Sequence, residues 1–162
     1  MVKTLVSRFF ELKLSEIIKL NWEELPVIQE DTPIDDVLHV LRSSHHVWVV
    51  NDLERRGLSG VITEKDFLEV LAPPNLSGFV FGMPDIRSLG LGTVETASDV
   101  MTRKVITTHR DVRIKEVIEK MRSYRVRRLP ILDKKALVGE VTLNILIQKY
   151  HDALNYIDIT VR

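Results

Sequence analysis

The chain has 162 residues, which is enough for one domain or for two small fused ones. Its apolar share of 44% and charged share of 28% are typical of a soluble globular protein and argue against a disordered or fibrous one. It contains no cysteine, which excludes disulfides, thiol nucleophiles and thiolate metal sites.

The charges balance overall but are divided along the chain. Lysine plus arginine and aspartate plus glutamate both number 23, so the net charge provides no general attraction to nucleic acid or anionic lipid. Residues 21–72 hold eleven acids and four bases, a net charge of −7, whereas residues 98–150 hold six acids and thirteen bases, a net charge of +7. The two halves of the chain therefore have opposite signs.

Residues 1–13 form an N-terminal extension with no continuous apolar stretch. Lys3, Arg8 and Glu11 interrupt it, so it resembles neither a signal peptide nor a membrane span. We therefore expect a cytoplasmic protein with no membrane partner.

The first half of the chain reads as a short series of strands and helices. The predicted elements are a lead-in at 14–19, a strand from 26, a helix at 34–43, strands at 47–50 and 57–62, and a helix from 63 that ends before two prolines at 73 and 74. Apolar residues at helical spacing support the helix at 34–43, and Thr32 is its candidate cap.

Residues 75–96 separate this half from the next and hold four of the seven glycines. Phe79, Val80, Phe81 and Met83 make the segment too apolar for a free linker, and a linker of this length in a compact protein is usually functional or disordered. We expect it to pack over a cleft or a dimer face, and we hypothesise that it reports ligand occupancy.

The second half repeats the first. Its predicted elements are a lead-in at 97–102, a strand at 104–106, a helix at 114–123, strands at 129–132 and 136–141, and a helix from 142 that continues into a C-terminal helical extension at 151–162. The apolar offsets of 114–123 match those of 34–43. The chain therefore uses one strand-helix-strand-strand-helix unit twice.

Three motifs in this repeat resemble the paired cystathionine-beta-synthase (CBS) domain, or Bateman module. They are SDVMT at 98–102, RRLPILD at 127–133 and GVITEKD at 60–66, and they occupy these places in order within a unit that is repeated twice. The resemblance implies an α+β fold of two tandem CBS domains, at 14–74 and 97–150, packed about a pseudo-twofold axis.

The same resemblance implies a regulatory or sensing module rather than an enzyme. Relatives hold AMP, ADP, ATP or S-adenosylmethionine between the two domains, and no other cofactor is required. They commonly form flat homodimers through their helices, and they act on a regulated protein that is unidentified here. The oppositely charged halves favour a head-to-tail dimer, while head-to-head is the usual alternative.

The resemblance also assigns ligand-binding residues. At the first site, Thr63 and Asp66 would contact ribose, and His45 and His46 would lie on the phosphate side. At the second site, Thr142 would act with Arg127 and Arg128. The expected ligand-binding set is completed by Ile28, Val47, Trp48, Ile106 and Pro130. Trp48 is either a core residue or a side chain that stacks on adenine.

A plainer interpretation of the GVITEKD motif remains open. Thr63 and Asp66 have the spacing of a capping box, in which the acid hydrogen-bonds the amide of the capping residue. Thr142 can still cap its helix although Ile145 replaces the acid. We therefore expect the carboxylate only where a ribose is bound, which gives one competent site and one degenerate one.

The sequence gives little support for nucleic-acid binding, metal binding or catalysis. The arginines of RSYRVRR at 122–128 are compatible with a phosphate contact, with a nucleic-acid-binding patch or with the exposed end of a helix. The zero net charge of the whole chain argues against nucleic-acid binding. The five histidines include no pair at His-x-x-x-His spacing, so no metal site is predicted. The sequence contains no nucleophile with a matched base and no phosphate-binding glycine loop, so it does not predict catalysis. The alternative to a ligand sensor is thus an interaction or nucleic-acid adaptor with empty clefts.

Overall fold

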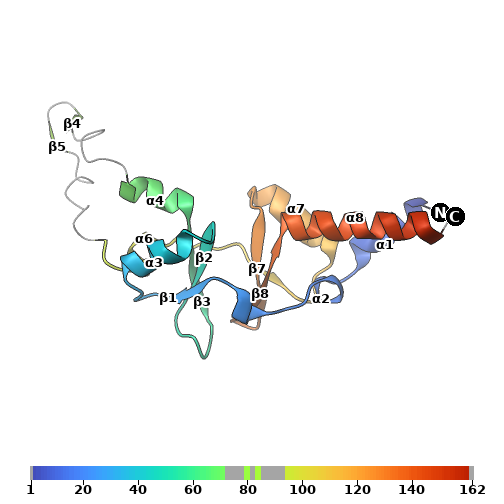
Figure 1. Cartoon of the computed structure of the whole chain (residues 1–162), viewed down its shortest axis with the longest axis horizontal. Helices are drawn as coiled ribbons and strands as arrows, with labels where there is room; N and C mark the ends of the chain where they lie inside the picture. The colour runs from blue at the N-terminus through green and yellow to red at the C-terminus, as the bar shows by residue number, and fades with distance from the viewer. Residues whose placement is uncertain (1, 72–78, 81–82, 85–93, 161–162) are drawn as a thin grey trace. The chain divides into compact units, whose positions relative to one another are not determined.

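The computed structural model describes residues 2–71, 79–80, 83–84 and 94–160 (Figure 1). The chain forms two compact units. Unit 1 comprises Met1–Leu25 and Ile106–Arg162, and unit 2 comprises Pro26–Val105. Unit 2 is therefore one continuous stretch of chain, whereas unit 1 is built from two stretches that unit 2 separates.

Unit 2 is a three-stranded sheet with helices. Its described elements are β1 (Val27–Gln29), α3 (Ile34–Leu41), β2 (His46–Val50), β3 (Leu58–Thr63), α4 (Glu64–Leu71), β4 (Phe79–Val80), β5 (Met83–Pro84) and α6 (Ala97–Val100). β1 pairs parallel with β2, and β2 pairs antiparallel with β3. β4 and β5 form a separate antiparallel pair. The helix α3 supplies the crossover that the parallel pair requires.

The core of unit 2 lies on one face of its sheet. Val47 and Val49 of β2 join Val37 of α3 and Phe67 of α4 in one buried cluster. Because successive side chains of a strand point to opposite faces, Trp48 points away from this cluster.

Unit 1 repeats this plan and adds an N-terminal helix. Its described elements are α1 (Val2–Glu11), α2 (Leu14–Ile17), the 3₁₀ turn η1 (Trp22–Glu24), β6 (Thr108–His109), α7 (Ile114–Tyr124), β7 (Arg128–Asp133), β8 (Ala136–Thr142) and α8 (Leu143–Thr160). β6 pairs parallel with β7, and β7 pairs antiparallel with β8. The strand order is therefore that of unit 2.

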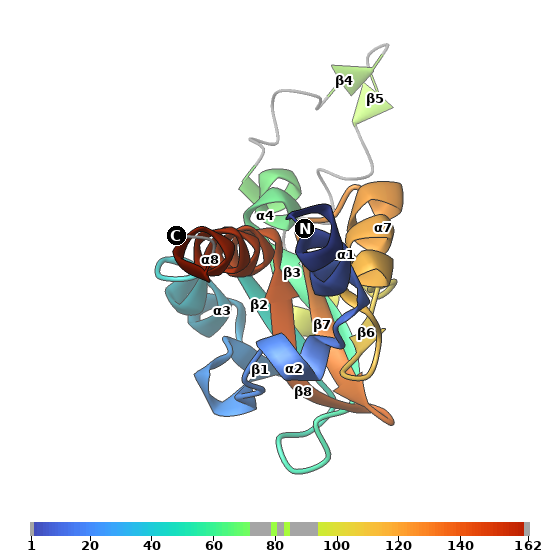
Figure 2. The ribbon, with the colours of Figure 1, turned by 90° about the vertical axis from the view of Figure 1, so that its right-hand side faces the viewer.

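Helix α1 lies between α7 and α8 (Figure 2). Phe9 of α1 belongs to the core cluster of unit 1, and its ring meets the ring of Tyr150 of α8 edge-on at a centroid distance of 5.5 Å. Phe10 lies 6.0 Å from the same tyrosine ring. Burial of these aromatic rings makes α1 an integral part of unit 1.

Each lead-in segment pairs with the other repeat. The amide of Leu14 donates to the carbonyl of Val112 at 2.9 Å, and the amide of Ala97 donates to the carbonyl of Thr32 at 2.9 Å. The segment that precedes the first repeat thus belongs to unit 1, and the segment that precedes the second belongs to unit 2. The two compact units therefore differ from the sequence repeats by an exchange of lead-ins.

The structure confirms the main helices and both hairpins and corrects two details. The strand expected at 104–106 lies instead at Thr108–His109. Thr32 does not cap α3, because Pro33 is the N-cap residue and the hydroxyl of Thr32 accepts from the amide of Gln29 at 3.1 Å. That hydroxyl closes the turn that follows β1 and is not available to the helix.

Two expectations concern other parts of the chain. Helix α8 continues into the segment that was expected to be a C-terminal helical extension, as far as Thr160. The packing expected of the apolar segment at 75–96 lies largely outside the described residues, which there include only β4, β5 and 94–96. The helix α1 was not among the predicted elements.

Candidate functional site

The junction between β3 and α4 in unit 2 holds the carboxylate of Asp66. Its Oδ2 accepts from the amide of Thr63 at 2.7 Å and from the hydroxyl of Thr63 at 2.7 Å. The first of these bonds satisfies an amide that the start of a helix leaves unpaired. The half of the capping box in which the acid reaches back to the capping residue is therefore present.

A third donor reaches Asp66 from a distant part of the chain. The hydroxyl of Thr102, which is 36 residues away in the sequence, donates to Oδ1 of Asp66 at 3.0 Å. Thr102 was not predicted as a site residue. Its only sequence signal is that it ends the SDVMT motif, and the motif alone does not indicate what it contacts.

The same capping arrangement occurs once more in unit 2. Asp99 Oδ2 accepts from the amide of Thr96 at 2.9 Å and from its hydroxyl at 3.2 Å, and also from the amide of Glu95 at 3.0 Å. The backbone hydrogen bonds from Thr96 and Glu95 hold the pKa of the Asp99 carboxyl below its ordinary value. A threonine three residues before an aspartate is therefore a cap at both places, and only at Asp66 does a distant hydroxyl join it.

The predicted histidines of the first repeat differ in exposure. His45 is 82% exposed, and its Nδ1 lies 3.0 Å from Oε1 of Glu64, the first residue of α4. This carboxylate places negative charge beside the expected phosphate position. His46 is buried and stacks edge-on with the buried ring of Trp48 at a centroid distance of 5.1 Å. Strand pairing places His46 opposite Thr63.

In the second repeat the junction is built without an acid. The hydroxyl of Thr142 accepts from the amide of Ile145 at 3.2 Å and so caps α8 directly. Arg128 of β7 is paired with Thr142 of β8 in the strand register, just as His46 is paired with Thr63 in unit 2. Arg127 is exposed, and its carbonyl accepts from the amide of Leu143 at 2.8 Å.

The apolar members of the predicted set are core residues. Ile28 and Val47 belong to the hydrophobic cluster of unit 2, and Ile106 packs against the cluster of unit 1. Pro130 is buried in β7, at the register position that corresponds to Trp48. Their place in the ligand-binding set stays a prediction.

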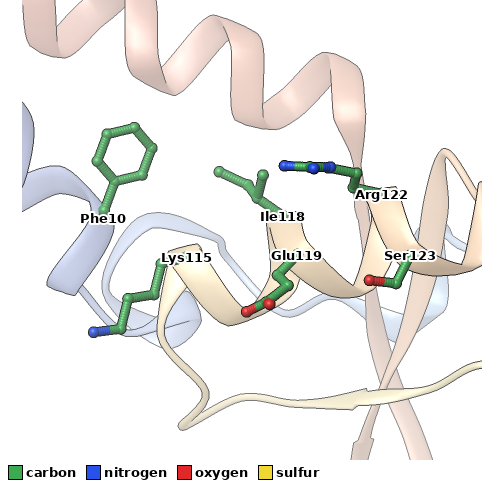
Figure 3. Close-up of a pocket in the computed structure, with 6 residues that line it drawn as sticks. All are labelled: Phe10, Lys115, Ile118, Glu119, Arg122 and Ser123. Carbon is green, nitrogen blue, oxygen red and sulfur yellow. The ribbon is translucent and has the colours of Figure 1, made fainter.

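A surface pocket of unit 1 contains none of the predicted residues (Figure 3). It encloses about 340 Å³ and is lined by Phe10, Lys115, Ile118, Glu119, Arg122 and Ser123. Phe10 comes from α1 and the other five from one face of α7, as Figure 3 shows. Lys115 already donates to Glu11 at 2.7 Å. The pocket is a groove where two helices of unit 1 meet.

In the described part of the chain, no three His, Asp or Glu side chains are grouped closely enough to hold a metal ion. Within the same residues, no helix combines the length and hydropathy that crossing a bilayer requires.

The fold and the junctions together define a class of protein. The chain is a tandem α+β module in which each repeat turns from a half-buried strand into a helix at a threonine. The CBS domain family model matches it twice, at residues 15–73 and 97–152. The chain therefore belongs to the CBS-domain family.

Several solved structures share this fold. CBSX2, in complex with AMP, has a TM-score of 0.69 at 19% identity over 86% of this chain and 96% of that one. The CBS domain pair of MJ0100, in complex with 5′-methylthioadenosine and S-adenosylmethionine, has a TM-score of 0.62 at 22% identity over 87% and 97%. The CBS domain of the bacterial CNNM/CorC family Mg²⁺ transporter, in complex with ATP, has a TM-score of 0.67 at 17% identity over 92% and 94%.

One curated protein also matches. The uncharacterized protein YlbB of Bacillus subtilis is 29% identical over 94 residues, which are 58% of this chain and 53% of that protein. The chain thus spans about half the length of this relative.

Proposed function

We propose that this protein is a regulatory sensor of an adenosine-containing ligand, with its competent site at Asp66 of unit 2. The observation that carries the proposal is the Asp66 carboxylate at the start of α4, which has Ile145 as its counterpart in the second repeat. A carboxylate can accept hydrogen bonds from two vicinal hydroxyls, whereas an isoleucine cannot. The AMP, ATP and S-adenosylmethionine complexes of proteins with this fold support the ligand class.

The second repeat is proposed as degenerate toward a nucleoside. A ribose hydroxyl buried against Ile145 would lose its hydrogen bond to water without replacement, at a cost of about 1 to 3 kcal/mol. Thr142 supports this assignment, because its hydroxyl already serves as the helix cap. The proposed role of Arg127 and Arg128 is to hold an anionic group on the phosphate side.

The net charge of unit 2 limits which adenosine-containing ligands are expected to bind tightly. Residues 26–105 contain twelve acids and seven bases, a net charge of −5, and Glu64 stands beside His45. Negative surroundings oppose a polyphosphate and favour a neutral or cationic group. We therefore expect S-adenosylmethionine, adenosine or AMP to bind more tightly than ADP or ATP.

The test is thermal unfolding with each of these ligands, repeated with Asp66→Ala. A ligand that binds only the native state adds about 2.7 kcal/mol at 100 times its dissociation constant. Asp66→Ala removes hydrogen bonds to a charged acceptor, each contributing about 1.5 to 3 kcal/mol, so the shift should disappear.

Asp99→Ala is the matched control, because Asp99 caps its helix with the same threonine geometry. Both variants should lose about 1 kcal/mol of stability as lost caps. Only Asp66→Ala should lose the ligand-induced shift. A shift of equal size in both variants, or no shift with any ligand in the wild type, would contradict the proposed sensor.

We also propose a homodimer formed through α4 and α8. Leu68 of α4 is 64% exposed and Ile147 of α8 is 59% exposed. Counted from Thr63 and Thr142, the two residues occupy the same position in their helices. Each repeat therefore presents an apolar side chain to solvent at the same point, and association would bury it.

A second candidate function rests on three exposed arginines of unit 1. Arg122, Arg125 and Arg127 lie at the end of α7 and just before β7. They fit an adaptor that binds nucleic acid through phosphates. Retention of RNA or DNA that falls steeply with salt, and is lost in Arg122→Ala/Arg127→Ala, would favour this function over the sensor.

A further inference from the structure

Thr102 links the Asp66 carboxylate to the stretch of chain that leaves unit 2. This connector, Met101–Val105, follows α6 and ends where unit 2 ends. Besides the hydrogen bond from the Thr102 hydroxyl to Asp66, the amide and carbonyl of Thr102 pair with the carbonyl and amide of Val61 at 2.9 and 3.0 Å. The connector is therefore held to β3 by its backbone and to α4 by a single side chain.

The close approach of the connector depends on Gly60. A Cβ atom at this glycine would lie 2.7 Å from Sδ of Met101 and 3.0 Å from the carbonyl oxygen of Thr102. Such distances exclude a side chain at position 60 unless the connector moves. The glycine of the GVITEKD motif thus permits the contact that brings Thr102 to Asp66.

Unit 1 lacks both members of this contact. The hydrogen bonds of the two lead-ins align Ala97 with Leu14, and this alignment places Lys19 at the position of Thr102. Ile145 stands at the position of Asp66. The acid and the hydroxyl are thus replaced together, which indicates that they function as a pair.

The acceptor capacity of Asp66 sets a limit on what else it can bind. A carboxylate has about four acceptor positions. Thr63 uses two through Oδ2, and Thr102 uses one on Oδ1. One position remains, whereas a ribose offers two vicinal hydroxyl donors. A ligand that donates both hydroxyls must therefore displace one of the bonds already present.

Thr102 is the donor that yields at least cost. The Thr63 amide belongs to the start of α4 and would be left without a hydrogen bond inside a partly buried junction. The Thr102 hydroxyl is exposed, so water can replace the carboxylate as its partner.

We propose that Thr102 is a positioning residue of the Asp66 site whose hydroxyl competes with the ribose diol for Oδ1, so that ligand binding releases the connector from α4. This inference rests on the proposed function. It identifies the contact through which occupancy of the site changes the chain that leads out of unit 2.

The ligand arm of the test measures binding of AMP and of 2′-deoxy-AMP to wild type, Thr102→Val and Thr102→Ser by calorimetry. Removal of the competing hydrogen bond should tighten AMP binding to Thr102→Val about threefold to tenfold, as one net hydrogen bond predicts. The deoxy compound has one sugar hydroxyl and fits the remaining acceptor position, so its affinity should stay within about twofold. Thr102→Ser keeps the hydroxyl and should behave as wild type.

The ligand-free arm measures amide hydrogen exchange at Thr102. Asp66→Ala and Thr102→Val should each raise this exchange rate about threefold to tenfold, while Asp99→Ala should not. AMP should also accelerate exchange at the Thr102 amide of the wild type, although it slows exchange elsewhere in unit 2.

Three results would overturn the inference. Weaker AMP binding by Thr102→Val would mean that Thr102 supports the site, and equal changes for both nucleotides would mean a general structural effect. Slower exchange at Thr102 with AMP would mean that the connector is not released. If AMP does not bind wild type, the proposed function and the competition both fail for AMP, and the ligand-free arm alone decides whether Asp66 holds the connector.

Discussion

Threonine caps the start of a helix in two different ways in this protein. At Thr63 and Thr96 the hydroxyl donates to an aspartate one turn into the helix, and the aspartate accepts from the threonine amide. At Thr142 the hydroxyl accepts from the amide of Ile145. Both arrangements satisfy an amide at the helix start. Only the first places a carboxylate, the group proposed to bind a diol, at the junction.

Thr108 has a hydroxyl that the fold accommodates but does not require. Its side chain is fully buried in β6, and its Oγ1 has no hydrogen-bond partner among the described residues. The strand register aligns Thr108 with Ile28 of unit 2. Thr108→Val keeps the shape and removes an unsatisfied hydroxyl, so we expect the free energy of unfolding to rise by about 1 kcal/mol. Urea unfolding of the two proteins checks this, and a clear loss of stability would show that the hydroxyl has a structural role.

The candidate site could be predicted in part at this scale. Asp66 was identified because its motif resembles a family signature, but the spacing from threonine to aspartate occurs equally at Thr96 and Asp99. Spacing alone therefore does not distinguish a ligand-binding acid from a cap. Thr102 was missed because its contact with Asp66 joins the start of a helix to a segment 36 residues further along the chain, and no local pattern encodes such a contact.

Among the elements, long helices were predicted better than short strands. Apolar residues at helical spacing specify α3 and α7 because each buries one continuous stripe. β6 has only two residues, so it leaves no periodic signal, and its predicted position was three to four residues too early. The exchange of lead-ins was not predictable either, because sequence repetition says which segments are alike and not which of them pair.

Glu11 fixes the end of α1 to the start of α7. Its two carboxylate oxygens accept from Lys115 and from Arg113, each at 2.7 Å. The hydrogen bond from Lys115 and the positive charges of both residues hold the pKa of Glu11 below its ordinary value of 4.5. Because the pKa is lower in the folded state, the ionised carboxylate stabilises the fold above about pH 4.5, and this contribution is lost as the pH falls through the folded-state pKa.

We therefore expect Glu11→Gln to change how the free energy of unfolding depends on pH in the acid range. The variant should be less stable than wild type at neutral pH, and the difference should shrink as the pH falls below 4.5. It should also shrink in 1 M salt, because the pair is exposed. Thermal unfolding between pH 3 and 7 checks this, with Glu119→Gln as an exposed control. A difference that stays constant over this range would show that Glu11 does not act through its charge.

At the scale of the whole molecule, charge is divided between the two units. Unit 2 carries a net charge of −5, and unit 1, with eleven acids and sixteen bases, carries +5. Two copies of the chain would attract when unit 1 of one meets unit 2 of the other. This division favours the head-to-tail form of the proposed homodimer.

Substitutions at Leu68 and Ile147 test the dimer and its orientation. Leu68→Asp or Ile147→Asp should weaken association by more than about 100-fold, since burial of a large aliphatic side chain contributes about 1.5 to 3 kcal/mol in each copy. Leu53→Asp is the control, because Leu53 is 46% exposed in a hairpin turn. Analytical ultracentrifugation reports the result, and a wild-type monomer at micromolar concentration would contradict the dimer.

The orientation follows from a charge-swapped double variant. Leu68→Lys/Ile147→Asp brings opposite charges together in a head-to-tail dimer and like charges together in a head-to-head dimer. We expect the double variant to dimerise more strongly than Leu68→Lys or Ile147→Asp alone. Continued dissociation would indicate the head-to-head form.

The division of unit 1 into two stretches has a consequence for biosynthesis. Unit 2 is complete when residue 105 has left the ribosome, but the first 25 residues belong with residues 106–162. At about 5–20 residues per second, the 80 residues of unit 2 take roughly 4 to 16 seconds to translate. During that time Phe9 and Phe10 have no core to enter. Helix α1, which is translated before unit 2, can therefore complete its packing only after residues 106–162 have been made, and until then the nascent chain exposes its two phenylalanines.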